Sequence, residues 1–327
     1  MSDVNGLVVT DVLGLAQPLQ KLIKTVAIGV GKVYEPTHIR RMAKAKADEI
    51  QIISKSINKN IALPIHYEDG AICIAAEDAN ELARRAQNRA LYQEMKKQQN
   101  IESVIAKAYD QLENTEEVSE DPVDPDWINE FFDNVANVSN EEMQVFWGKL
   151  LAGEVSKPKS FSLRTLATLK NLTNYEAQIF TKVAPYILGN IADLNEGYIN
   201  YFLLSDPNLL EHNGISFGQI LRLSEAGLVT VTGNTMIGFD IEPKHHTVII
   251  NRNKCIHIKN SSDQRVALKY PVYPLTEAGT ELFPIACNTK DLGNDDYILD
   301  CLDYLRHKGF GAFYNDSWPQ EISASIE

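Results

Sequence analysis

Apolar residues recur at helical spacing over most of the first half of the chain. Between residues 12 and 34 one helix face would carry Leu19, Leu22, Ile23, Val26, Val30, Val33 and Tyr34. Lys21, Lys24 and Lys32 interrupt the apolar run, so the pattern predicts an amphipathic helix and not a membrane-spanning one. Two interpretations stay open. This face packs against the rest of the protein or a second subunit, or it lies on an anionic membrane surface.

A second amphipathic helix is predicted over residues 37–59, with Thr37 as its N-cap. Its polar face carries a basic cluster that could meet phosphate, acidic lipid or an acidic segment of the same chain. We favour the last, as an ion-pair interface within or between subunits. The candidate residues for partner or lipid contact are Leu19, Leu22, Ile23, Val26, Val30, Arg40, Arg41, Lys44 and Lys46.

A third, longer helix is predicted over residues 77–113, with a break near Asn100 as an alternative. Acidic residues dominate the next segment of the chain: residues 111–142 hold eleven acidic side chains and no basic one. Such a run is typical of a solvated linker, and a docking strip for a basic partner is the alternative. We therefore divide this part into N-terminal amphipathic helices (residues 1–113) and an acidic linker (residues 114–124).

Residues 125–189 contain closely spaced helix-start signals and predict a central helical bundle. Asp124 can cap a helix that begins at Pro125. Ser139 with Glu142, and Thr173 with Glu176, have the spacing of capping boxes. Gly153 stands where a helix C-cap is expected. The large aromatic residues of this range favour a packed core, while an aromatic groove for a peptide or a partner helix stays open.

The character of the chain changes in residues 190–327. Ser216 caps a predicted helix that ends at Gly227, and Thr276 caps another. β-Branched residues predict strands between them, at residues 228–231, 236–241, 247–251 and 255–259, and a last helix and strand follow at 295–308 and 311–314. The order helix, strand, hairpin, strand indicates a winged-helix-like module. The predicted fold class is thus mainly α with an α+β tail.

Composition narrows the function classes. The formal net charge of −13 argues against a general nucleic-acid binder. The candidate recognition helix SFGQILRLSEAG carries only Arg222 as a positive charge, which argues against binding to duplex DNA. The four cysteines have no metal-site spacing and are interpreted as free thiols in a reducing cytoplasm. The first residues lack the positive region of a signal peptide.

No catalytic motif emerges from the sequence, and we expect no cofactor. His246, Cys255 and His257 are candidates for a metal site across a hairpin, although alternation along a strand turns the neighbours His245 and His246 to opposite faces. The strand residues Asp240, Glu242 and Lys244 are similar to the acidic and lysine cluster of metal-dependent nucleases. A surface strand with paired charges explains them equally well, so we assign no catalytic residue and no metal.

Two stretches carry a family resemblance. The runs PLQKLIKTVAIGVGKVYEPTHIRRMAKAKADEI and DPDWINEFFDNVANVSNEEMQVFWGKLLAGEVSKPKSFSLRTLATLKNLT resemble an uncharacterised bacterial family, domain-of-unknown-function family 2806. A helical front followed by a winged-helix-like tail with LTEAGTELF is similar to the abortive-infection alpha family of phage-defence proteins.

The resemblance implies a bacterial role in antiviral defence. We expect a non-enzymatic, cytoplasmic, oligomeric protein that acts through helix-mediated assembly or partner binding. The alternatives are a peripheral membrane effector that uses residues 12–59 and a DNA-binding winged-helix regulator.

Overall fold

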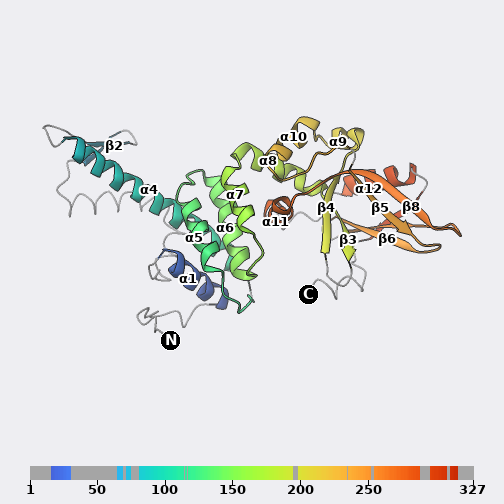
Figure 1. The fold of residues 1–327 in the computed structure, drawn as a ribbon, viewed down its shortest axis with the longest axis horizontal. Coiled ribbons are helices and arrows are strands. Elements are labelled where there is room, and N and C mark those ends of the chain that lie inside the picture. Colours follow the sequence, from blue (N-terminus) through green and yellow to red (C-terminus); the bar gives the residue numbers. More distant parts are fainter. Residues whose placement is uncertain are drawn as a thin grey trace. The chain divides into compact units, whose positions relative to one another are not determined.

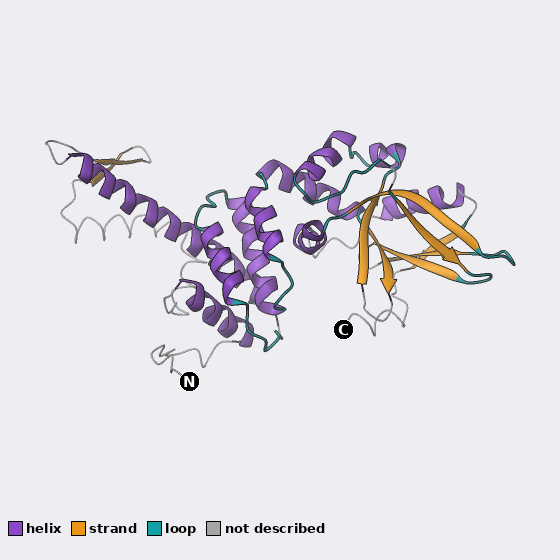
Figure 2. Ribbon diagram, viewed as in Figure 1, coloured by secondary structure: helices purple, strands orange, loops and turns teal. Residues whose placement is uncertain are grey.

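The protein consists of two compact units, Met1–Ser160 and Phe161–Glu327, which are described separately. The computed structural model describes residues 16–30, 65–68, 71–74, 81–113, 115, 117–193, 198–233, 235–251, 254–287, 295–307 and 310–315. Helices dominate the first unit, and a seven-stranded antiparallel sheet lies in the second (Figures 1 and 2). The predicted combination of a helical front with an α+β tail is therefore confirmed at this coarse level. The boundary between the units falls inside residues 125–189, which the sequence pattern groups as one bundle.

The core of the first unit is formed by helices that are distant in sequence. Helix α1 (Gln17–Val30) packs against α4 (Glu81–Leu112), α5 (Pro125–Val135) and α6 (Glu141–Ser156), and a separate hairpin joins β1 (Ile65–Glu68) to β2 (Ala71–Ile74). Large rings fill the centre, because Phe131 lies 5.2 Å from Trp127 and 5.5 Å from Trp147 between ring centroids. All three are buried. These three aromatic residues therefore belong to the core of the first unit. The helix predicted over residues 37–59 lies outside the described residues.

Helices α4 and α6 approach each other closely at two places. A Cβ atom on Gly148 would lie 2.6 Å from the Cβ atom of Lys107, so only glycine fits this crossing without a shift. Nearer the start of α6, Gln144 accepts a hydrogen bond from Ser103 (2.7 Å) and donates one to the carbonyl oxygen of Val138 (2.8 Å). Helix α4 runs unbroken through Asn100, so the alternative of a break there is wrong.

Most of the N-caps predicted from the sequence are found in the structure. Asp124, Thr173, Ser216 and Thr276 cap helices as predicted, and Thr173 forms the expected capping box with Glu176. The prediction for Ser139 is wrong by one residue: Asn140 caps α6, and its Oδ1 accepts the N–H of Met143 at 3.0 Å. The prediction that Gly153 ends α6 is also wrong, because buried Glu154 and Val155 continue the helix to Ser156.

The second unit combines one sheet with short helices. The helices are α7 (Leu163–Asn171), α8 (Asn174–Val183), α9 (Pro207–His212), α10 (Phe217–Glu225), α11 (Glu277–Ala286) and α12 (Asp295–His307), with a 3-10 turn at Ala184–Tyr186. The strands are β3 (Leu188–Asp193), β4 (Tyr198–Leu204), β5 (Met236–Ile241), β6 (His246–Asn251), β7 (Lys254–Lys259), β8 (Val266–Pro274) and β9 (Gly311–Asn315). Their order in the sheet is β5-β8-β4-β3-β6-β7-β9.

Three of these strands were not predicted, and they lie at the middle of the sheet. Strand β8 ends in a segment with Pro271 and Pro274, which normally argue against a central strand. Proline lacks an N–H to donate, but its carbonyl oxygen can accept a hydrogen bond. The carbonyl oxygen of Pro271 accepts the N–H of Ser205 (3.0 Å), and that of Pro274 accepts the N–H of Thr230 (2.7 Å). The predicted strand at residues 228–231 is reduced to an isolated bridge between Val229 and Leu275.

One face of the sheet carries the main core of this unit. Side chains from β4, β6, β7 and β8 pack there with Tyr297, Ile298, Cys301, Leu302 and Leu305 of α12. Only the last three residues of β8 (272–274) pair with β4, opposite Phe202 to Leu204, and the chain then leaves β4 to enter α11. The first residues of β4 therefore have β3 on one side and no strand among the described residues on the other.

Candidate functional site

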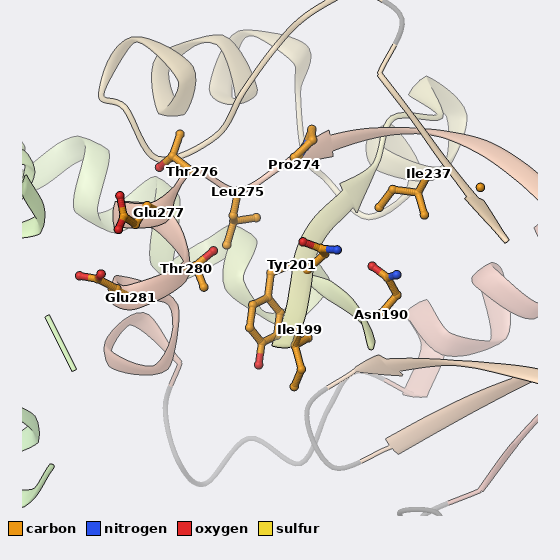
Figure 3. A pocket seen from close by; sticks show the side chains of 12 residues that line it. Asn190, Ile199, Tyr201, Ile237, Pro274, Leu275, Thr276, Glu277, Thr280 and Glu281 are labelled. Atoms are coloured by element: carbon orange, nitrogen blue, oxygen red, sulfur yellow. The ribbon is translucent and has the colours of Figure 1, made fainter. Parts of the chain in front are cut away.

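A cavity of about 850 Å³ opens where β8 leaves β4 (Figure 3). We call it the β4 cavity and define it by its lining residues: Asn190, Ile199, Asn200, Tyr201, Ile237, Gly238, Pro274, Leu275, Thr276, Glu277, Thr280 and Glu281. These belong to β3, β4, β5, the end of β8 and the start of α11. The volume is in the range of cavities that bind small ligands or short peptide segments.

The cavity reaches both faces of the sheet. Asn200 and Tyr201 are neighbours on β4, so their side chains point to opposite faces, and both line the cavity. On one side Tyr201 packs against Phe283 of α11, with ring centroids 5.0 Å apart. On the other, Ile237 packs against the main core. The cavity therefore passes around the edge of β4.

Asn190 supplies a buried polar group at this site. Its side chain is 7% exposed, and its Oδ1 has no hydrogen-bond partner within the part of the chain that the structure describes. A buried acceptor without a donor costs about 1–3 kcal/mol. A ligand N–H at this position would remove that cost.

The start of α11 forms an acidic wall. Glu277 pairs with Arg164 of α7, and both side chains are exposed. One Glu281 oxygen accepts the backbone N–H of Ser162 at 2.7 Å. A carboxylate accepts further hydrogen bonds after the first, so both groups can still accept from a ligand. No lysine or arginine is among the lining residues, and the wall therefore favours a ligand with positive charge.

Burial raises the pKa of the Tyr201 hydroxyl, and the neighbouring Cys287 adds to the shift. The hydroxyl thus stays protonated at neutral pH and serves as a hydrogen-bonding group. Together with the two carboxylates, the hydroxyl gives the cavity three groups that can hydrogen-bond to a ligand.

Asn190, Tyr201, Thr280 and Glu281 were not predicted from the sequence as site residues. Their roles depend on the place where β8 leaves β4, which no local pattern reveals. The motif LTEAGTELF was the one available signal, since it supplies five lining residues: Leu275, Thr276, Glu277, Thr280 and Glu281.

The residues predicted for partner or lipid contact lie elsewhere. Leu19, Leu22, Ile23 and Val26 of α1 are buried, and Val30 is half-buried. Their face meets α4, α5 and α6 of the same chain, which favours the interpretation of a helix packed within the protein. Arg40, Arg41, Lys44 and Lys46 lie outside the described residues. Within the described ranges, no helix combines the length and the apolar character needed to cross a membrane.

Of the three residues predicted as metal candidates, only His246 and His257 lie close together across β6 and β7, because Cys255 pairs with Ile250, four residues along β6 from His246. The rings of His246 and His257 are 5.3 Å apart between centroids, and His257 stacks on Phe313 of β9 at 4.9 Å. Cys255 is buried. Among the residues that the structure describes, no group of three or more histidine, cysteine, aspartate or glutamate side chains is placed to hold a metal ion.

The second set of candidate metal-binding residues is engaged in surface ion pairs. Arg265 reaches Asp240 at 2.6 Å and Glu242 at 3.5 Å. Lys244 pairs with Asp263 at 2.8 Å. Only Asp240 lies on β5; Glu242 and Lys244 follow it in the turn to β6, so the prediction that the three alternate along one strand is wrong. The surface ion pairs favour the alternative of paired surface charges over a nuclease site.

Comparison with known proteins identifies a family. Residues 84–298 match a family model described as a protein of unknown function (DUF2806). The match includes every lining residue of the β4 cavity. No curated protein and no solved structure matches the chain.

Proposed function

The chain belongs to the DUF2806 family of proteins of unknown function, and we propose that it is a non-enzymatic bacterial defence protein that acts by binding a partner. In this proposal the second unit recognises the partner at the β4 cavity, and the helices of the first unit support assembly. The defence role comes from the likeness in layout to the abortive-infection alpha family. The binding role comes from the site.

The observation that carries the binding role is a cavity of about 850 Å³ that contains the buried amide of Asn190. The β4 cavity joins apolar walls to the amide of Asn190 and the hydroxyl of Tyr201. Ligand sites typically have this mixture of an apolar lining with a few convergent polar groups. Its carboxylates are hydrogen-bonded or paired, so the arrangement supports recognition rather than acid–base chemistry.

We retain a winged-helix-like arrangement of α8, α10 and α11 as part of this proposal. Helix α8 packs against α10. The Val229–Leu275 bridge joins the segment after α10 to the residues just before α11, with β5 to β8 between them in the chain. Tyr175, Phe217 and Leu221 of these helices are exposed by 56%, 53% and 40%. Exposed apolar side chains on a candidate recognition helix favour contact with protein over contact with phosphate.

The two alternative functions have less support. Binding of α1 to a membrane would require its buried face to leave α4, α5 and α6. Liposome flotation with and without anionic lipid tests this alternative. For duplex DNA, the candidate recognition helix offers Arg222, whose guanidinium lies over the ring of Tyr175 at 5.6 Å. An absence of duplex binding at low salt would remove this function.

The defence role is tested by expressing the protein in a bacterium that lacks it and challenging the cells with a panel of phages. We expect fewer plaques with the wild-type protein and with Thr181→Phe, which adds the same bulk on the exposed side of α8. Thr280→Phe fills the β4 cavity and should abolish the protection. A wild-type protein that protects against no phage of the panel would contradict the defence role.

Assembly is tested separately by the molar mass in solution. Size-exclusion chromatography with light scattering should give a mass above the 36.6 kDa of one chain. A strict monomer at high concentration would remove self-assembly and leave binding to a different protein.

A further inference from the structure

We infer that the β4 cavity binds a short extended segment of another protein, which adds as a strand beside the first residues of β4 and presents a basic side chain to α11. The inference rests on the proposed function and specifies its partner. It follows from the backbone at the β4 edge, from the two-sided cavity and from its charge.

Among the residues that the structure describes, no strand pairs with the first residues of β4 on the side of the cavity. Tyr201 is the last β4 residue bonded on that side, where its carbonyl oxygen accepts the N–H of Leu275 at 2.9 Å. Backbone groups point the same way at every second residue of a strand, so those of Ile199 face the space that β8 has left. An extended peptide can continue the line of β8 there and hydrogen-bond to β4, which is a recurring mode of peptide recognition.

The shape of the cavity fits an extended chain. Because the cavity passes around the β4 edge, a ligand must place groups on both faces of the sheet. A strand does so by geometry, since its successive side chains point to opposite faces. One side chain would face Asn190 and Ile237, and the next would face Tyr201 and α11 (Figure 3).

The charge of the site selects the residue that faces α11. Glu277 and Glu281 line this end of the cavity, and Arg164 offsets only one of the two charges. A lysine or arginine of the ligand would meet the second carboxylate. At the other face, Asn190 offers an amide that is 7% exposed, with an oxygen that has no partner among the described residues. A neutral side chain or backbone N–H of the ligand satisfies it.

The test uses the full chain and a mixture of short peptides with acetylated and amidated ends and randomised central residues. The mixture is dialysed to equilibrium against the protein, and retained peptides are identified by mass spectrometry. We expect peptides with one lysine or arginine flanked by neutral residues to be retained. The same peptides with N-methylated backbones should not be, because N-methylation removes the donors that strand pairing needs.

Variants separate the site from the rest of the surface. Glu281→Gln should weaken retention by about tenfold, as expected for one charge-assisted hydrogen bond. Glu277→Gln should weaken it less, because Arg164 already offsets that charge. Glu225→Gln makes the same charge change at an exposed position of α10 and should leave retention unchanged. Thr280→Phe should abolish retention. Since Glu281 also accepts a backbone N–H, circular dichroism of each variant checks that it is folded.

Retention of no peptide, or retention that survives N-methylation or Thr280→Phe, would overturn the inference. Its failure is distinguishable from failure of the proposed function. If Thr280→Phe abolishes protection against phage while no peptide is retained, the cavity binds a ligand of a different class, and the inference alone fails. If Thr280→Phe leaves protection intact, the cavity has no part in the function.

Discussion

Gly279 lies so close to the backbone carbonyl of Leu228 that no side chain fits between them. A Cβ atom at position 279 would overlap the carbonyl oxygen and lie 2.9 Å from the carbonyl carbon. Three residues earlier, Thr276 donates its N–H to Leu228 (3.0 Å) and its hydroxyl to Gly227 (2.6 Å). These contacts hold the first turn of α11 against the end of α10 and thereby fix the acidic wall of the β4 cavity.

Gly279→Ala should therefore destabilise the second unit. The obstacle is a backbone carbonyl that cannot rotate away, so we expect a loss of about 1–3 kcal/mol in the free energy of unfolding, as for other overpacked sites. Urea denaturation followed by circular dichroism measures the loss. Gly218→Ala in α10 is the control, because its nearest neighbour would be Ser216 Oγ at 3.9 Å. Alanine favours helix there, so this variant should be neutral or slightly stabilised; equal losses in both would contradict the prediction.

Asn100→Ala should destabilise the first unit. The Asn100 amide is 7% exposed and donates to the carbonyl oxygen of Ala136 at 2.8 Å, which ties α4 to the end of α5. Removing the donor leaves a buried carbonyl oxygen unpaired, at a cost of about 1–3 kcal/mol. Asn137→Ala removes a similar bond at an exposed position and should change stability by less than about 0.5 kcal/mol. Chemical denaturation of the two variants side by side decides the matter.

Two substitutions on α1 test whether its apolar face is a core surface. Leu22 is 0% exposed and Ile28 is 57% exposed. We expect Leu22→Ala to cost about 2–5 kcal/mol, because it leaves a cavity among α4, α5 and α6. Ile28→Ala should have an effect within about 0.5 kcal/mol. Thermal and chemical unfolding measure both, and a silent Leu22→Ala would show that α1 is not held in the core in solution.

The cysteines should differ in reactivity. Burial raises the pKa of the Cys255 thiol to about 11 and that of Cys301 to about 12. At pH 8 only about one in a thousand Cys255 thiols would be ionised, and the thiolate is the reactive form. Iodoacetamide should thus label half-buried Cys287 first in a Cys73→Ser background. Peptide mapping by mass spectrometry gives the order; early labelling of Cys301 would contradict its burial.

The same shifts predict a pH dependence of stability. A thiol whose pKa is raised on folding keeps its proton in the folded state while the unfolded chain loses it above the ordinary value of 9.0. The free energy of unfolding should therefore fall as the pH rises from about 9 to about 11. Cys301→Ala should reduce the slope. Urea denaturation at a series of pH values measures it, and a flat profile would be the contrary result.

Local signals in the sequence determined four of the helix starts. Asp124, Thr173, Ser216 and Thr276 act through hydrogen bonds that reach only two or three residues, so their role is legible without knowledge of the fold. The strands β5, β6, β7 and β9 were predicted for a related reason, since β-branched and aromatic residues mark them. The N-cap of α6 could not be assigned from the sequence, because Ser139 and Asn140 are neighbours with equally good capping side chains. The structure shows that Asn140 is the cap.

Tertiary structure decided which elements pair and where space is left. Strand β8 contains two prolines and becomes central because Ser205 and Thr230 donate to their carbonyl oxygens from other segments. The β4 cavity exists because β8 turns into α11 after Leu275, and Asn190 becomes part of it through pairing of β3 with β4. Local sequence fixes how a segment bends and ends. Long-range packing decides which other segments lie beside it. The candidate site lies beside the first residues of β4, where no described strand pairs on one side.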